Sequence, residues 1–190
     1  LYYIYFNKGV NKLEPFYVNL PNNHVLKTLY LEHEIILKTL DEISDLNTKI
    51  QKIQDLESAI PLLSELHQLS TILTDSEPHH QREEEALFPV MIERGMGGPP
   101  TVMTMEHGPI RELKHSLKDI SINYKNVSWD ELKSAINKNS IGLCQMLSDH
   151  IQKENQMCYP MALQGIPEKH VWDEIKKKAD KIGYCSFTPK

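Results

Sequence analysis

Apolar residues recur at helical spacing along most of this chain. In the first such stretch they follow the i, i+3, i+4, i+7 pattern that puts side chains on one face of an α-helix. That stripe comprises Leu26, Leu29, Tyr30, His33, Ile36, Leu37 and Leu40. Three later stretches share the period, so the pattern predicts four long amphipathic helices over about residues 24–46, 56–94, 101–124 and 128–161.

Local signals mark the ends of these helices. The run Gly97-Gly98-Pro99-Pro100 separates the second from the third, since proline suits the first turn of a helix. Ser128 and Glu131 have the spacing of a capping box at the start of the fourth. A fifth helix is predicted over residues 167–182. Long helices with short connections indicate an all-α fold, an up-and-down antiparallel four-helix bundle with an extra C-terminal helix.

The N-terminal residues have a different composition from the rest. Tyr2 to Phe6 and Phe16 to Leu20 are aromatic and β-branched, with a turn signal at Asn7-Lys8-Gly9 between them. We therefore expect a short extended arm or hairpin over residues 1–21 and one helical domain over residues 22–190, which suits a chain of 190 residues.

Composition and charge exclude several classes of function. The formal net charge of −5 argues against nucleic-acid binding. No apolar run reaches the roughly 18 residues of a membrane span, and no secretory signal is visible. The three cysteines are odd in number and lack CxxC spacing, which is typical of reduced thiols. We expect a cytoplasmic protein without a membrane or nucleic-acid partner.

Histidine and glutamate repeat along the chain. In two places a histidine is followed four residues later by a glutamate and ten residues later by a proline: His79, Glu83 and Pro89, then His150, Glu154 and Pro160. We expect the helix to bend at the first of these prolines. An i, i+4 pair lies on one helix face, so each pair aims an imidazole and a carboxylate at one point. A single histidine precedes each pair, at His33 and His107, and both lie on apolar stripes.

This repeat predicts a site for two metal ions. A buried ionised carboxylate without a partner costs several kcal/mol, and no lysine or arginine is expected to face inward on these stripes. Two divalent ions and a bridging hydroxide would bring two buried glutamates close to neutrality. Imidazole and carboxylate ligands suit iron, zinc or manganese, and the lack of thiolates argues against a closed structural zinc site.

Alternatives remain open at this point. A single histidine on an apolar stripe is more often a core residue than a ligand. The partner of His79 is Glu83 if the two prolines are aligned, but Glu84 remains a second candidate for the bridging position. A ferritin-like reading would use Glu-x-x-His pairs; the pair Glu112 and His115 is flanked by basic residues and is expected to face solvent.

The residues together resemble the hemerythrin-like HHE cation-binding family. The resemblance covers roughly residues 22–190 and is carried by Glu32-His33, the run from His79 to Pro89, Met105-Glu106-His107, and the run from His150 to Pro160. It implies a four-helix bundle holding two non-heme iron ions, which an oxo or hydroxo group would bridge. It implies that the metal ligands are His33, His79, His107 and His150, with Glu154 and either Glu83 or Glu84 as bridges.

One departure from the family pattern bears on function. Oxygen-carrying hemerythrins have a further histidine one turn before the third-helix histidine, where this chain has Met103. We therefore expect a binding or sensing module for dioxygen, redox state or iron rather than an oxygen carrier. Its partners would be a small diatomic ligand, dioxygen or nitric oxide, and a protein partner or upstream domain. The alternatives are an enzyme that acts on peroxide or nitric oxide or supplies iron for cluster repair, and a purely structural metal site.

Overall fold

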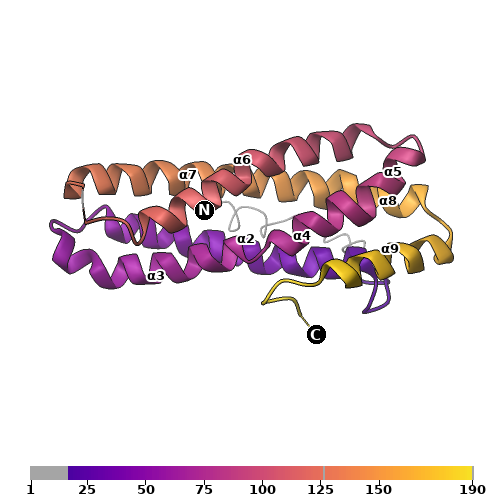
Figure 1. Ribbon diagram of the computed structural model, residues 1–190, viewed down its shortest axis with the longest axis horizontal. Helices are drawn as coiled ribbons and strands as arrows, with labels where there is room; N and C mark the ends of the chain where they lie inside the picture. The colour runs from indigo at the N-terminus through magenta and orange to yellow at the C-terminus, as the bar shows by residue number, and fades with distance from the viewer. Residues whose placement is uncertain (1–16, 126, 190) are drawn as a thin grey trace, which may run out of the picture.

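The computed structural model describes residues 17–125 and 127–189. Most of the expected N-terminal arm lies outside the described residues, so its conformation stays a prediction. Among those described, the protein is helical, and the long helices run side by side along one axis (Figure 1). The expected all-α bundle with an extra C-terminal helix is therefore confirmed. No helix in the described ranges is long and apolar enough to cross a membrane.

The bundle consists of four helical columns, which we call rods, and two of them contain more than one helix. The first rod is α2 and the third is α6, each a single helix. The second passes from α3 through a short break into α4, a π-helical turn and α5, and the fourth passes from α7 through a second π-helical turn into α8. The bounds are α2 Val25–Ile50, α3 Leu56–Thr74, α4 Glu77–Arg82, η1 Glu83–Leu87, α5 Phe88–Glu93, α6 Gly98–Ile120, α7 Trp129–Lys153, η2 Glu154–Cys158, α8 Tyr159–Gly165 and α9 Lys169–Ile182.

The helix ends follow the sequence signals. The His24 side chain accepts a hydrogen bond from the Leu26 amide at the start of α2. The capping box predicted from Ser128 and Glu131 is formed. Gly183 ends α9 with a φ of 99°, a backbone conformation that residues with a Cβ atom rarely adopt. These local contacts satisfy backbone groups that a helix end would otherwise leave unpaired.

The two prolines of the histidine repeat produce π-helical turns. Proline has no amide hydrogen, and its ring clashes with the carbonyl four residues before it. The turn ahead of each proline widens, and the amides of Phe88 and Tyr159 donate to the carbonyls of Glu83 and Glu154, five residues back. Both π turns thus begin at a glutamate of the repeat, and such turns are frequent at functional sites. A π turn thus precedes Pro89, where we expected a bend.

Apolar residues form two core clusters, one towards each end of the bundle. The larger joins α2, α3, α6 and α7 and includes Ile43, Leu66, Leu117 and Leu143. The smaller joins α2, α5, α6, α8 and α9 and includes Leu29, Met91, Met103 and Trp172. The helix α9 packs against α2, α4 and η1. On α2 and α6, the buried His33 and His107 lie between the residues of the smaller cluster and those of the larger one.

Candidate metal centre

Four histidines, one from each rod of the bundle, converge in the interior in two pairs. His33 on α2 and His79 on α4 place their Nε2 atoms 3.0 Å apart. His107 on α6 and His150 on α7 do the same at 3.0 Å. All four are at most 1% exposed. We call His33 and His79 the first half-site, and His107 and His150 the second half-site.

The opposite nitrogen of each imidazole is held by an acceptor oxygen. Carboxylate and amide oxygens only accept hydrogen bonds, so each Nδ1 carries the proton and, in a neutral imidazole, leaves Nε2 bare. Two bare nitrogens 3.0 Å apart repel unless a proton or a cation lies between them. The Nδ1 contacts are His33 with Asn155 at 2.9 Å, His79 with Glu32 at 2.7 Å, His107 with Glu84 at 2.6 Å and His150 with Glu106 at 2.8 Å.

A cationic side chain lies behind each of the three carboxylates. Arg82 donates to Glu32 at 2.6 Å, Arg111 donates to Glu84 at 3.1 Å, and Lys153 pairs with Glu106. Each of these carboxylates is thus neutralised from outside and is free to orient its histidine. The acceptor behind His33 is a neutral amide instead. Such partners fix the ring orientation and raise the basicity of a metal-ligating histidine.

The Glu154 carboxylate lies between the two half-sites. Its Oε2 is 3.2 Å from His33 Nε2, and its Oε1 is 3.0 Å from His150 Nε2. Two groups of potential ligands therefore share this one residue: the first half-site with Glu154, and the second half-site with Glu154. Each group combines two imidazoles and one carboxylate, the donor set typical of non-heme iron sites with open coordination positions.

Glu83 is also buried at the centre. Its Oε2 is 3.6 Å from His79 Nε2 and 3.5 Å from His107 Nε2, so it faces both half-sites. Tyr159 donates a hydrogen bond to the other oxygen, Oε1, at 2.6 Å. The structure leaves Glu83 Oε2 and both oxygens of Glu154 buried without a hydrogen-bond donor. Unpaired buried carboxylate oxygens are costly, and cations would satisfy them, so the residues present fit a pair of metal ions.

The ionisation of the centre supports the same conclusion. Burial and the nearby charge of Glu154 raise the pKa of Glu83 well above its usual range. Burial also acts to raise the pKa of Glu154, but the positive charge of His150 holds that pKa well below its usual range. Burial opposes the charged form of His150, yet Glu154 raises its pKa overall. Without metal, protons therefore occupy positions that cations would take.

Comparison with known proteins shows the family to which this chain belongs. The model of the hemerythrin HHE cation binding domain matches residues 24–162, which contain all four histidines and both central glutamates. The chain belongs to the hemerythrin HHE cation-binding family. The family resemblance expected from the sequence is thereby confirmed.

The chain is also similar to two curated proteins that are named for iron–sulfur cluster repair. The iron-sulfur cluster repair protein YtfE of Escherichia coli O157:H7 is 31% identical over 156 residues, which is 75% of this chain and 65% of that protein. YtfE of Yersinia pseudotuberculosis is 31% identical over 144 residues, or 70% of this chain and 62% of that protein. The chain thus covers less than two thirds of the length of these relatives.

The structure distinguishes Glu83 from Glu84, the two candidates that the sequence left open for the bridging position. Glu83 is fully buried with the converging nitrogens, whereas the Glu84 side chain is 23% exposed and lies on the Nδ1 side of His107. Because η1 begins at Glu83, the next side chain turns away from the interior of the hemerythrin bundle. The structure thus groups Glu83 with the four histidines and Glu154 at the centre, and it places Glu84 behind His107.

The expectation of no inward-facing cation was wrong. Arg82 and Lys114 are 1% and 2% exposed. Arg82 lies under the segment after α9, where it contacts Cys185 Sγ and the Tyr184 ring. Helical periodicity could not predict that this segment buries Arg82. Lys114 lies seven residues after His107 on the same face and donates to Ser76. The seven-residue spacing could have predicted that Lys114 faces inward. Arg82 pairs with Glu32, so it does not neutralise the two central carboxylates, Glu83 and Glu154.

The orienting residues also follow a repeat that sequence reasoning passed over. The residue before each single histidine, Glu32 or Glu106, holds the second histidine of the same half-site. The residue after each central glutamate, Glu84 or Asn155, holds the first histidine of the opposite half-site. The repeated Glu-His dipeptide was the signal available for the first pair.

Neighbouring residues complete the surroundings of the centre. His80 is buried and stacks on His107 with ring centroids 4.0 Å apart, and its Nδ1 has no hydrogen-bond partner in the structure. Met103, at the position where oxygen carriers have a further histidine, is fully buried in the smaller core cluster. His67 contacts the Ser121 hydroxyl at 3.1 Å, and His170 is exposed. His67 and His170 thus lie outside the centre.

Proposed function

We propose that this hemerythrin domain binds two iron ions, one at each half-site, with Glu154 shared between them. The observation that carries the proposal is the convergence of bare imidazole nitrogens and unpaired carboxylate oxygens in a buried space. Two imidazoles and one carboxylate per ion favour iron over a closed structural zinc site, which would be saturated by four protein ligands. The residues that would hold the ions are His33, His79, Glu83, His107, His150 and Glu154.

We further propose that the chain works in iron–sulfur cluster repair. Two curated relatives bear that function in their names. An iron pair would supply exchangeable iron and open positions for a small ligand such as dioxygen or nitric oxide. The chain's own side chains would orient the ligand nitrogens and keep bulk water out, as their burial indicates.

Metal analysis tests the first part of this proposal. Protein purified without added metal should contain two iron atoms per chain, and His150→Ala should lose iron while the exposed control His170→Ala keeps it. Repair is tested by adding the iron-loaded protein to an enzyme whose iron–sulfur cluster has been damaged with nitric oxide. Recovery of enzyme activity should depend on His150. Metal other than iron, or recovery that is equal with His150→Ala, would refute the respective part.

A second candidate function is sensing, and one contact favours it. Thr188, in the segment after α9, donates a hydrogen bond to Glu32, which in turn holds His79. A ligand-induced shift of His79 would therefore be transmitted through the Glu32 carboxylate to the segment after α9. A protein partner that binds this segment would respond to the shift. Hydrogen exchange of residues 183–189 should change when nitric oxide is added to the reduced iron-loaded protein. Unchanged exchange would remove the support for sensing.

A further inference from the structure

A glycine at the end of α8 packs directly against a methionine side chain. Gly165 is the last residue of α8, and a Cβ atom at this position would collide with Met96 Sδ and lie 2.5 Å from Met96 Cε. The thioether therefore occupies the space that a side chain at position 165 would fill. We call this space the Gly165 notch, and it exists because glycine has no Cβ atom.

The backbone of Met96 is fixed by the end of α5. Gly95 has a φ of 80°, and the Met96 amide donates a hydrogen bond to the carbonyl of Met91, five residues back, at 2.9 Å. A left-handed glycine followed by this hydrogen bond is the Schellman arrangement that closes a helix. The Met96 side chain packs against the smaller core cluster but is partly exposed. The thioether is thus held in place and can still be reached by a small solute.

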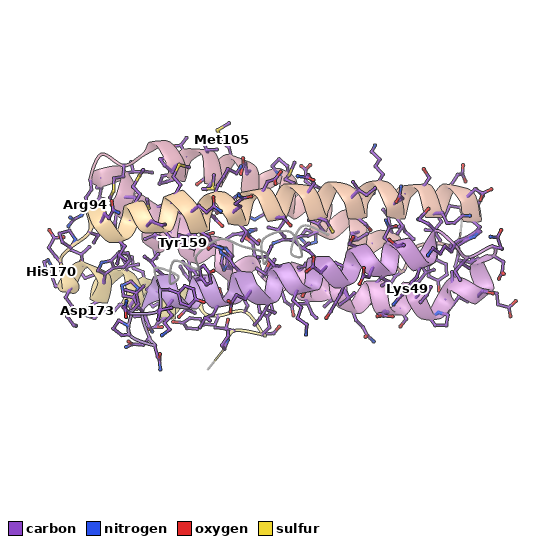
Figure 2. The ribbon with its side chains drawn as sticks, turned by 180° about the vertical axis from the view of Figure 1, so that it is seen from behind. Lys49, Arg94, Met105, Tyr159, His170 and Asp173 are labelled. Atoms are coloured by element: carbon purple, nitrogen blue, oxygen red, sulfur yellow. The ribbon has the colours of Figure 1, made fainter. Side chains whose placement is uncertain are left out.

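The Gly165 notch lies where three helices meet. The glycine carbonyl accepts a hydrogen bond from Arg94 Nη1 at 3.2 Å, and Arg94 also pairs with Glu168 at 2.9 Å. The next carbonyl, that of Ile166, accepts from the Trp172 indole of α9 at 2.7 Å. Figure 2 shows Arg94 at the same end of the molecule as the labelled residues of α9. Met96 therefore packs where the end of α5, the end of α8 and the first turn of α9 are held together.

We propose that Met96 is a site of reversible oxidation by hydrogen peroxide, and that its sulfoxide releases the loop between α8 and α9. The Met96 sulfur attacks one peroxide oxygen, so that a sulfur–oxygen bond forms and the oxygen–oxygen bond breaks. The second oxygen leaves as water with the proton of the first. Sulfur is oxidised by two electrons and the peroxide is reduced by the same two, and a thiol-dependent reductase returns the sulfoxide to the thioether. The inference goes beyond the proposed function and needs no bound metal.

Oxidation changes both the size and the polarity of the group in the notch. The thioether already fills the space over Gly165, so an additional oxygen has no room on that side. The surroundings of Met96 include apolar side chains of the smaller core cluster, which offer a buried sulfoxide oxygen no hydrogen bond. The oxidised side chain should therefore leave the notch for solvent. The end of α8 then loses its packing against α5, and α9 loses the support of the loop that precedes it.

Peroxide treatment of the full chain loaded with zinc tests the proposal, because zinc has no redox chemistry of its own. Mass spectrometry should find one added oxygen on Met96. Amide hydrogen exchange over residues 166–182 should become at least about tenfold faster, as expected for a locally loosened unit. Treatment with methionine sulfoxide reductase should restore the slow exchange. Met91 and Met103, which are fully buried in the same cluster, should stay unoxidised.

Two variants separate this site from general oxidation. Met105 is 72% exposed and points away from the bundle (Figure 2), so it should be oxidised faster than Met96 with no effect on α9. Met105→Leu should therefore respond to peroxide as the wild type does, whereas Met96→Leu, which keeps an apolar side chain, should not respond. The inference is overturned if Met96 stays a thioether while Met105 is oxidised, or if exchange is unchanged although Met96 carries the oxygen. A response that persists in Met96→Leu would overturn it as well.

Discussion

The two half-sites of the centre use the same ligands but differ in what stands behind them. The ion pair of the first half-site is sealed: Arg82 and Glu32 behind His79 are at most 1% exposed and are covered by the segment after α9. The second half-site is open: Arg111 and Glu84 behind His107, and Lys153 and Glu106 behind His150, have side chains that are 23–38% exposed. A repeated sequence thus produces equal ligands in unequal electrostatic surroundings.

This difference teaches that burial, rather than the type of ligand, distinguishes the two half-sites. An ion pair that is shielded from water holds its histidine rigidly, but removal of one partner leaves an uncompensated charge. An exposed ion pair is screened and contributes little.

The largest effect should come from the residue that both half-sites share. Glu154→Ala should reduce bound iron to near zero, because each group of ligands loses its carboxylate. His33→Ala removes a ligand from the first half-site only and should leave about one ion per chain. Metal analysis of both variants, with circular dichroism to verify helix content, measures the difference. Equal metal loss in the two variants would argue against a shared carboxylate.

The sealed ion pair should matter more for stability than the open one. Arg82→Met leaves the buried Glu32 carboxylate without its cationic partner and should lower the free energy of unfolding by about 3–5 kcal/mol. Arg111→Met, whose partners Glu77 and Glu84 reach solvent, should cost about 1 kcal/mol or less. Urea denaturation of the metal-free variants compares them. Similar losses would show that the cover over Arg82 does not exclude water.

The two repeats also differ seven residues after the single histidines, where the first has Leu40 and the second has Lys114. Burial lowers the pKa of Lys114 to about 8. Because this pKa lies below that of the unfolded chain, the unfolded state binds more protons between pH 8 and 10.5. The contribution of Lys114 should therefore be unfavourable below pH 8 and improve as the pH rises through that window, by at most about 3 kcal/mol.

The measurement is the difference in unfolding free energy between wild type and Lys114→Leu as a function of pH. The variant should be more stable at neutral pH, and its advantage should shrink as the pH approaches 10.5. The Ser76 hydroxyl retains its hydrogen bond to the Leu73 carbonyl in the variant, so no orphaned donor obscures the comparison. A difference that is constant with pH would contradict the assigned burial of the ammonium group.

The smallest effect should come from the neutral amide behind His33. Asn155→Asp would give His33 the same kind of carboxylate partner as the other three histidines. Metal should then leave the first half-site about tenfold more slowly, since outer-shell carboxylates raise the basicity of a histidine ligand. Stopped-flow transfer of the metal to a chromophoric chelator resolves this phase. An unchanged rate would show that the partner of His33 does not limit metal release.

Much of the fold could be predicted from local patterns. The apolar period and the caps at Ser128 and Gly183 act within a few residues, and the helices begin and end close to these signals. The histidine repeat brought His33, His79, His107 and His150 together because four stripes that are buried in one bundle must share one interior. Alignment of the two prolines favoured Glu83 over Glu84, but only the structure shows that Glu84 lies behind His107 instead of at the centre.

By its own pattern of apolar and chelating residues, the sequence determined a helical bundle and a polar, histidine-rich layer inside it, because periodicity is a local property of the chain. Only the tertiary structure decided that Arg82 is buried under the segment after α9 and that the Tyr159 hydroxyl reaches Glu83 rather than Glu154. These contacts join residues more than 70 positions apart, and their geometry depends on how the rods pack against one another.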